Sequence, residues 1–434
     1  MLSASMTRRD LLRASAAAAG TAVFPDRNVL QDAHPDIPGY LQPPPEAAAV
    51  FSKNYGSQRI SRVQAAIRAA GLDALIVTNR CLDYLSYVCN FHPFPLEPGL
   101  ALVPVEGQVT LFVNTYSPAH TRALQAMVWT DDLVDVPHDA ISEGSNQNLV
   151  DSCIQRLRDR KLDRGRIGLA GDEIDWILPY YLNTKVPGAQ IVDAGRTLTE
   201  LIVVKDETEL KLIRFAQRYI DEVAYPTFQA TLRPGEMDHV IYGRVLGNIL
   251  ERGASPSTVL LFDAGPPGAG TWARGPLGQR LQAGDIVLSE PTPSIAGYQS
   301  EKMYTFALGR SIPDSQKQGA EVVYAAFNLV MEELKPDREL TLILEKLDAF
   351  MRRHGYDGCT VPVGHWIGTQ NHEGPRFTPE GSRGWILKPN MVMSWHPNVV
   401  IPGKVRTTCS TCVVITPEGA KDLSSIKMQP IYYV

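Results

Sequence analysis

Short apolar strands alternate with helical stretches between residues 57 and 193, and this alternation limits the possible folds more than any other feature. Helices that separate short strands in this way can cover both faces of one sheet. We therefore expect a three-layer α/β domain at residues 57–200. Its expected helices lie at 57–70, around Tyr84, and at 118–127, 148–160 and 176–182, and its expected strands at 74–78, 100–103, 109–113, 133–136, 167–170 and 190–193.

A second domain is expected at residues 201–434, because 434 residues exceed what one hydrophobic core usually serves. It begins with a charged helical stretch at 207–224. Strands are expected at 258–263, 286–290, 298–307 and within 385–415, and two long helices between Asp314 and His354. A hydrophobic fraction of 44% is ordinary for a globular enzyme, and a net charge of only −5 argues against a nucleic-acid partner.

The N-terminus has the order of a twin-arginine export signal. Arg8 and Arg9 precede an apolar, Ala-rich run from Leu11 to Val23, which is too short to span a bilayer with ease. We expect residues 1–25 to be a signal peptide and the mature protein to be periplasmic or otherwise exported; a basic amphipathic helix is the alternative. Residues 26–56, rich in Pro and Ala, are expected to form an extended leader.

Six cysteines are far too few for a disulfide scaffold in a chain of this length. Only Cys409 and Cys412 lie close together in the sequence, in a β-like run. A redox motif or half of a metal site would fit the spacing, but no second CxxC exists. We expect buried, unpaired thiols.

The segment 363–375, VGHWIGTQNHEGP, sets His365 and His372 seven residues apart on backbone bounded by glycines. Imidazole serves as a general acid, a general base and a metal ligand near neutral pH. A structural role is the usual alternative for one histidine, but two in such a segment indicate a functional site.

This segment resembles the GHxxG and HExP signature of the creatinase, prolidase and methionine aminopeptidase family. The stretch LIVVKDETELKLIRFA at 201–216 is similar to the domain junction of that family. The resemblance implies a creatinase-type N-terminal α/β domain at 57–200 and a C-terminal pita-bread catalytic domain at 201–434. GDIVLSE and NMVMSWHP are similar strand phrases, as an internally duplicated pita-bread domain would have.

The family's metal-dependent members hold two divalent ions with two aspartates, one histidine and two glutamates. The resemblance places Glu290 and Glu301, eleven positions apart, at the aspartates, and His365 at the histidine. His396 and Ser410 then replace the two glutamates. Two divalent ions held by two carboxylates would leave excess positive charge in a poorly solvated cleft. We expect a metal-free site, or one zinc, iron or manganese ion on Glu290, Glu301, His365 and His396.

The expected catalytic groups are three histidines and two carboxylates that can exchange protons. Neighbouring carboxylates have shifted pKa values and imidazole titrates near neutrality, so such a cluster can supply an acid and a base. These groups are His365, His372, His396, Glu290 and Glu301.

Several aromatic side chains fall in or beside the motifs and could wall a pocket for a flat molecule; ordinary core packing is the alternative. They are Trp272, Trp366, Trp395, Tyr298 and Tyr304. Arg274 or Arg406 could bind an anionic group, or could be structural. Creatine is a poor fit, because Met303 and His396 stand where creatinase has acidic substrate anchors.

These features predict a non-peptidase enzyme that acts on a small, aromatic molecule by His/Glu acid–base chemistry. The expected reaction is that of a lyase, by elimination or a retro-aldol step, or of a C–N hydrolase. A metal-dependent Xaa-Pro aminopeptidase or dipeptidase and a catalytically inactive binding module are the alternatives. The resemblance also implies a homodimer, and we expect neither a nucleic-acid nor a membrane partner.

Overall fold

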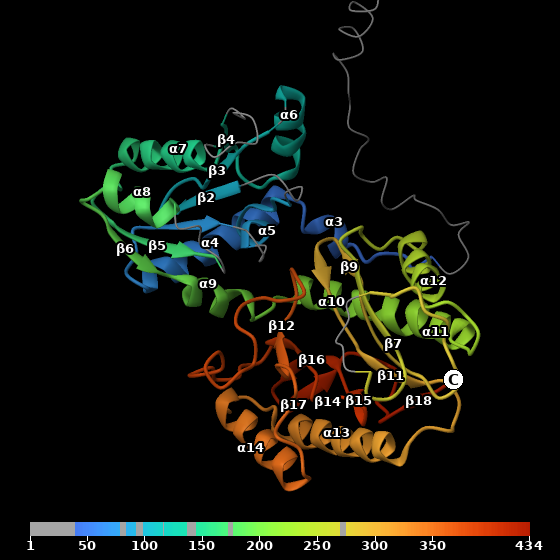
Figure 1. The fold of residues 1–434 in the computed structure, drawn as a ribbon. Coiled ribbons are helices and arrows are strands. Elements are labelled where there is room, and N and C mark those ends of the chain that lie inside the picture. The colour runs from blue at the N-terminus through green and yellow to red at the C-terminus, as the bar shows by residue number, and fades with distance from the viewer. Residues whose placement is uncertain are drawn as a thin grey trace, which may run out of the picture.

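A computed structural model describes residues 40–78, 84–92, 99–115, 117–136, 145–171, 177–269 and 275–434. The blue-to-green N-terminal part lies above the yellow-to-red C-terminal part (Figure 1). The expected signal peptide, and the candidates Trp272 and Arg274, lie outside the described residues.

The N-terminal part contains a six-stranded mixed sheet in the order β4-β3-β2-β1-β5-β6. Along β1, Leu75 and Val77 pack on one face, and Ala74 and Ile76 pack on the other. The first face is covered by α4, α5 and α9, and the second by α7 and α8, so the expected three layers are confirmed. The elements are α4 (Lys53–Ala69), β1 (Ala74–Thr78), α5 (Tyr84–Cys89), β2 (Gly99–Pro104), β3 (Thr110–Val113), α6 (Pro118–Met127), β4 (Asp132–Asp135), α7 (Ser145–Asp159), β5 (Arg166–Ala170), α8 (Ile177–Lys185), β6 (Gln190–Asp193) and α9 (Gly195–Ile202).

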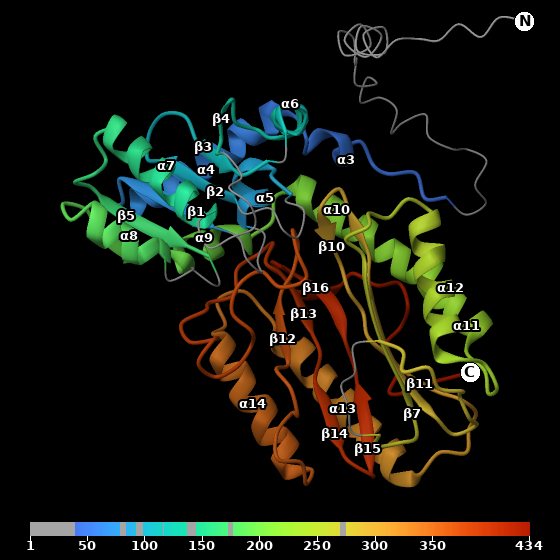
Figure 2. The same ribbon diagram turned by 45° about the horizontal axis from the view of Figure 1, so that its top comes forward.

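The C-terminal part contains two four-stranded sheets, β18-β11-β8-β7 and β12-β13-β16-β17, which lie side by side in Figure 2. Helices α11 and α12 pack on the first sheet, and α13 and α14 on the second. Its helices are α10 (Glu207–Tyr219), the π-helix η1 (Ile220–Ala224), α11 (Tyr225–Thr231), α12 (Asp238–Glu251), α13 (Asp314–Glu333) and α14 (Leu340–Arg353). Its strands are β7 (Val259–Gly265), β8 (Ile286–Thr292), β9 (Ser294–Ile295), β10 (Tyr298–Gln299), β11 (Tyr304–Ala307), β12 (Gly364–Trp366), β13 (Val392–Trp395), β14 (Asn398–Ile401), β15 (Val405–Thr408), β16 (Thr411–Thr416), β17 (Gly419–Asp422) and β18 (Tyr432–Tyr433).

The expected strand 298–307 is interrupted, and the interruption matters for the site. Strand β10 ends at Gln299 and β11 begins at Tyr304. The four residues between them are not paired with any strand. Glu301 therefore lies on irregular backbone rather than within a strand.

The expected extended leader is wrong in its last part. Residues Glu46–Ala49 form the short helix α3, and α4 already begins at Lys53, where the Ser52 side chain accepts a hydrogen bond from the Tyr55 amide at 3.2 Å. Ala47 and Val50 belong to the hydrophobic cluster around α10. Burial of these apolar side chains holds the segment on the C-terminal part.

Two further expectations concern cysteines and membranes. Cys409 and Cys412 are buried free thiols, so the prediction that they are unpaired is confirmed. Within the described ranges, we find no helix that combines the length and the apolar character needed to cross a membrane.

Candidate active site

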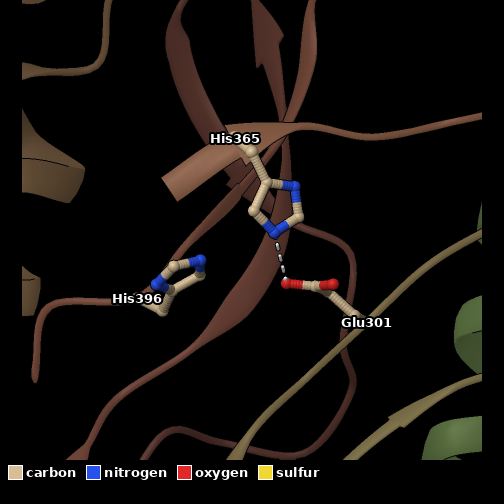
Figure 3. Close-up of side chains that lie close together, drawn as sticks. All are labelled: Glu301, His365 and His396. Atoms are coloured by element: carbon tan, nitrogen blue, oxygen red, sulfur yellow. Dashed lines mark ion pairs between the residues drawn. The ribbon is translucent and has the colours of Figure 1, made fainter. Parts of the chain in front are cut away.

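His365 lies on β12 opposite Ser394 of β13, and its ring is buried. Its Nδ1 atom lies 3.2 Å from the Trp366 carbonyl oxygen, and its Nε2 atom lies 3.2 Å from Oε1 of Glu301 (Figure 3). Because a carbonyl oxygen only accepts, Nδ1 is the protonated nitrogen of this pair. Nε2 therefore faces a carboxylate oxygen, and a proton or a shared cation must lie between them to stabilise the contact.

Glu301 is fully buried and is held at both oxygens. Oε1 faces His365, and Oε2 accepts a hydrogen bond from Nδ2 of Asn371 at 2.9 Å. Burial raises the pKa of Glu301, but the charge of His365 and its hydrogen bond outweigh the burial and hold the pKa below the usual range. Glu301 is therefore a carboxylate anion that points one oxygen toward the two histidines (Figure 3).

His396 follows β13 and faces Glu301 and His365 (Figure 3). One ligand atom of each of these three residues lies within 4.8 Å of the other two. Burial, and then the charge of His365, lowers the pKa of His396 to about 4. Its Nδ1 atom is buried with no hydrogen-bond partner among the described residues. A neutral imidazole with a free buried nitrogen is the form that binds a metal.

His372 stacks on the same cluster without belonging to the three ligand groups. Its ring centroid lies 3.8 Å from that of His365, at an interplanar angle of 30°. Burial, and then the charge of His365, lowers the pKa of His372 to about 3. This histidine is therefore a neutral imidazole beside the cluster, and the structure brings together three of the five expected catalytic groups with His372 alongside.

Two positions taken from the family pattern, Glu290 and Ser410, add no ligand atom to this compact group. Glu290 lies on β8 and is buried, but it is not among the groups whose ligand atoms all lie within 4.8 Å of one another. Ser410 lies between β15 and β16, is buried, and has no charge. Of the four expected ligands, the structure places Glu301, His365 and His396 in one compact group.

The expectation that Trp366 and Trp395 wall a substrate pocket is wrong. Both side chains have 0% exposure and belong to the core beneath α13 and α14. The Trp366 ring lies 4.9 Å from that of Phe377 and 5.2 Å from that of Trp385. Successive side chains of a strand point to opposite faces, so the residue after His365 must turn away from the site.

The other described candidates for substrate binding are also structural. Tyr304 packs between aromatic rings in the core of the first sheet, and Tyr298 contacts the buried Arg59 at 3.3 Å. Arg406 forms a buried ion pair with Asp263 at 2.6 Å and donates to the Ile286 carbonyl oxygen at 2.6 Å. Nη1 and Nη2 are both engaged in the core, so the guanidinium is held as a structural group.

Asn371 is a site residue that the sequence reasoning missed. It stands directly before His372, inside the motif, and a polar side chain at that position was the available signal. Glu373, on the other side of His372, was also missed; it pairs with the buried Lys205. No local pattern links Lys205 to Glu373, because 168 positions separate them.

The mixed three-layer domain and the paired sheets are the two-domain architecture of the pita-bread type (Figure 2). Residues 59–201 match the creatinase/prolidase N-terminal domain, and residues 211–417 match metallopeptidase family M24. The chain belongs to the creatinase/prolidase branch of family M24.

Known relatives support the same assignment over most of the chain. A protein of Bacillus subtilis named putative dipeptidase YkvY is 24% identical over 376 residues, which cover 84% of this chain and 97% of that protein. An Xaa-Pro dipeptidase of Pyrococcus horikoshii is 23% identical over 279 residues, which cover 61% of this chain and 76% of that protein. The crystal structure of dipeptidase PepE from Mycobacterium ulcerans matches with a TM-score of 0.74 and 21% identity. The match covers 88% of this chain and 100% of that protein.

These relatives overturn the expected reaction. Their names are those of dipeptidases and Xaa-Pro dipeptidases, so the prediction of a non-peptidase enzyme for an aromatic molecule is wrong. A hydrolase is supported and a lyase is not. The prediction failed because it took altered ligand types as a lost peptidase site, whereas Glu301, His365 and His396 still form a compact donor set.

Enzymes of this family are typically metal-dependent. Two observations fit one divalent ion in this chain: the free buried Nδ1 of His396 and the opposed Nε2 of His365 and Oε1 of Glu301. The same residues do not fit the family's pair of ions, since Ser410 carries no charge and Glu290 stands apart from the compact set.

Proposed function

We propose that this chain is a metal-dependent dipeptidase or Xaa-Pro peptidase that uses a single divalent ion held by Glu301, His365 and His396. The observation that carries the proposal is the approach of their ligand atoms to within 4.8 Å of one another. The names of the relatives support peptide hydrolysis as the reaction.

Two imidazoles and one glutamate are the protein ligands of the zinc peptidases thermolysin and carboxypeptidase A, which keep one coordination position open. An ion bound there would polarise a scissile carbonyl and lower the pKa of water. The donor set therefore suits peptide hydrolysis with one ion, where the usual family members use two.

The chain's own residues supply the remaining functions. His372 stacks on His365 with ring centroids 3.8 Å apart, and its neutral imidazole can hydrogen-bond a group bound at the cluster. Asn371 holds Oε2 of Glu301 at 2.9 Å, which leaves Oε1 directed at the histidines. Such outer partners orient a ligand and raise the affinity for its metal.

The test is elemental analysis of the purified protein beside hydrolysis of Xaa-Pro and other dipeptides, before and after chelation. We expect about one equivalent of metal, as for a site with three protein ligands, and loss of hydrolysis on chelation. Zinc, manganese and iron should then be added back singly, and at least one should restore activity.

Two histidine-to-alanine variants, one inside and one outside the site, provide a matched comparison. His396→Ala should lose the metal and the activity, whereas His239→Ala should lose neither, because His239 is an exposed residue of α12. Two bound equivalents, or full activity without metal, would contradict the single-ion proposal. A metal-loaded protein that cleaves no dipeptide would contradict the peptidase proposal and favour the inactive binding module.

We also propose export by the twin-arginine pathway and a homodimeric state. The Arg8-Arg9 pair before the Ala-rich run supports the first. Secretion of a reporter fused to residues 1–25, compared with the Arg8→Lys/Arg9→Lys variant, tests export. Light scattering on the mature protein tests the oligomeric state.

A further inference from the structure

A buried ion pair joins the linker between the two domains to the loop that carries Asn371 and His372. The pair is formed by Nζ of Lys205 and Oε2 of Glu373, whose side chains are 0% and 1% exposed. Lys205 lies between α9 and α10, and Glu373 directly follows His372. The contact therefore connects the domain junction with the active-site loop.

The Lys205 end of the pair is fixed by its surroundings. Its Nζ also donates to the Ile202 carbonyl oxygen at 2.8 Å, and its amide donates to the Asn390 carbonyl oxygen at 2.9 Å. The preceding residue, Val204, forms a β-bridge with Met391 just before β13. The ammonium group therefore has a set position relative to the second sheet, which carries His365.

The Glu373 end holds the loop. Its Oε1 accepts hydrogen bonds from the amide of Thr369 at 2.5 Å and from the hydroxyl of Thr369 at 3.0 Å. Its own amide donates to the Trp366 carbonyl oxygen at 3.0 Å. The carboxylate thus closes the turn 369–373 across its base, with Asn371 and His372 on the turn.

A glycine makes room for the pair. A Cβ atom on Gly368 would overlap Nζ of Lys205 and would lie 2.6 Å from Oε1 of Glu373. The carbonyl oxygen of Gly368 accepts from the Gln299 amide at 2.7 Å, which ties the same point to the segment leading to Glu301. The second glycine of the GHxxG motif therefore leaves the space that the ion pair fills.

We infer that Lys205 and Glu373 are positioning residues, which hold Asn371 and His372 against Glu301 and His365. The geometry of the site then depends on the position of the linker between the two domains. The inference rests on the proposed peptidase function. A buried ion pair is weak evidence for stability, because desolvation of the two charges offsets their attraction. A role in geometry accounts for the pair better than a role in stability.

The test compares Lys205→Met with Arg59→Met. Arg59 forms a second buried ion pair at the junction, with Glu209 at 3.0 Å, and contacts none of the three proposed ligands or His372. Both variants should lower Tm, by roughly 10 °C, since each leaves a buried charge unpaired. Only Lys205→Met should lower kcat, by about 100-fold, with KM and metal content little changed.

The double variant Lys205→Met/Glu373→Leu separates geometry from stability. Replacing both charges by apolar groups should restore most of the lost Tm. The kcat value should stay low, because the hydrogen bonds from Thr369 to Glu373 are also lost. Recovery of kcat together with Tm would overturn the inference, as would an equal loss of kcat in Arg59→Met.

Hydrogen exchange keeps this test independent of the reaction. In Lys205→Met, the amides of residues 368–374 should exchange at least about tenfold faster than in the wild type, since loops held by few contacts open more readily. In Arg59→Met they should not. Equal exchange in the two variants would overturn the inference, whereas a wild-type protein that cleaves no dipeptide would overturn only the proposed function.

Discussion

The Nε2 atom of His365 lies 3.2 Å from Oε1 of Glu301, while Nδ1 of the same ring is engaged by the Trp366 carbonyl oxygen. If Nε2 carried no proton, two lone pairs would be directed at one another in a buried site. A cation shared with His396 would relieve this repulsion. The geometry therefore calls for a proton or a shared cation between the two atoms.

The variant Glu301→Gln should bind zinc at least about 100-fold more weakly than the wild type, because it removes the anionic ligand itself rather than an outer partner. The amide of the new side chain can donate to Nε2 of His365, so the metal-free variant should unfold at the same or a higher temperature. Calorimetric titration with zinc and thermal unfolding after chelation check the two effects. Wild-type zinc affinity would remove Glu301 from the ligand set.

Loss of the Asn371 amide should weaken metal binding without unfolding the protein. Asn371→Leu removes the 2.9 Å hydrogen bond to Oε2 of Glu301, and loss of an outer partner costs about 10- to 100-fold in metal affinity. Asn183→Ala is the control, since this exposed residue of α8 lies in the N-terminal part. Zinc titration of both variants should show a change only in the first.

Hydrophobic periodicity was sufficient to predict the layers of the N-terminal domain. The runs at 74–77 and 167–170 contain no polar side chain, as expected for strands covered on both faces, and both strands are confirmed. The break between β10 and β11 could not be predicted in this way, because residues 298–307 are too short a run to show where pairing stops.

Motif spacing located part of the site but misplaced its aromatic neighbours. Glu301, His365 and His396 were predicted from their positions in the family pattern, and the structure brings them together. Trp366 was assigned to the same site because it is adjacent in sequence, although adjacent strand residues face opposite ways. The partnership of Lys205 and Glu373 depends on tertiary packing across 168 positions, for which the sequence has no local signal.

The corrected role of Trp366 predicts a loss of stability rather than a loss of substrate affinity. Trp366→Ala should lower the free energy of unfolding by about 3–5 kcal/mol, the usual cost of deleting a large buried side chain. Tyr180→Ala, at a side chain that is 54% exposed, should change it by less than about 0.5 kcal/mol. Urea unfolding measures both. A stable Trp366→Ala protein with a raised KM would return this residue to the substrate pocket.

Two glycine-to-alanine substitutions should change the free energy of unfolding in opposite directions. In Gly368→Ala, the new methyl group would overlap the Lys205 ammonium and press on Glu373, so the free energy of unfolding should fall by about 1–3 kcal/mol. In Gly247→Ala, within α12, the methyl group meets open space. Alanine should there raise the free energy of unfolding by about 1 kcal/mol, through its higher helix propensity. A neutral Gly368→Ala variant would show that the ion pair tolerates displacement.

Cys359 lines a cavity of about 360 Å³ beside α14, and its thiol should react only at alkaline pH. Burial raises the pKa of Cys359 to about 11, and the thiolate is the reactive form. Because the neutral thiol predominates below that pKa, the rate of alkylation by iodoacetamide should rise about tenfold for each pH unit between 7 and 10. Mass spectrometry of the modified peptide gives the rate. A plateau below pH 9 would mean that the thiol is solvated and that the cavity is open to water.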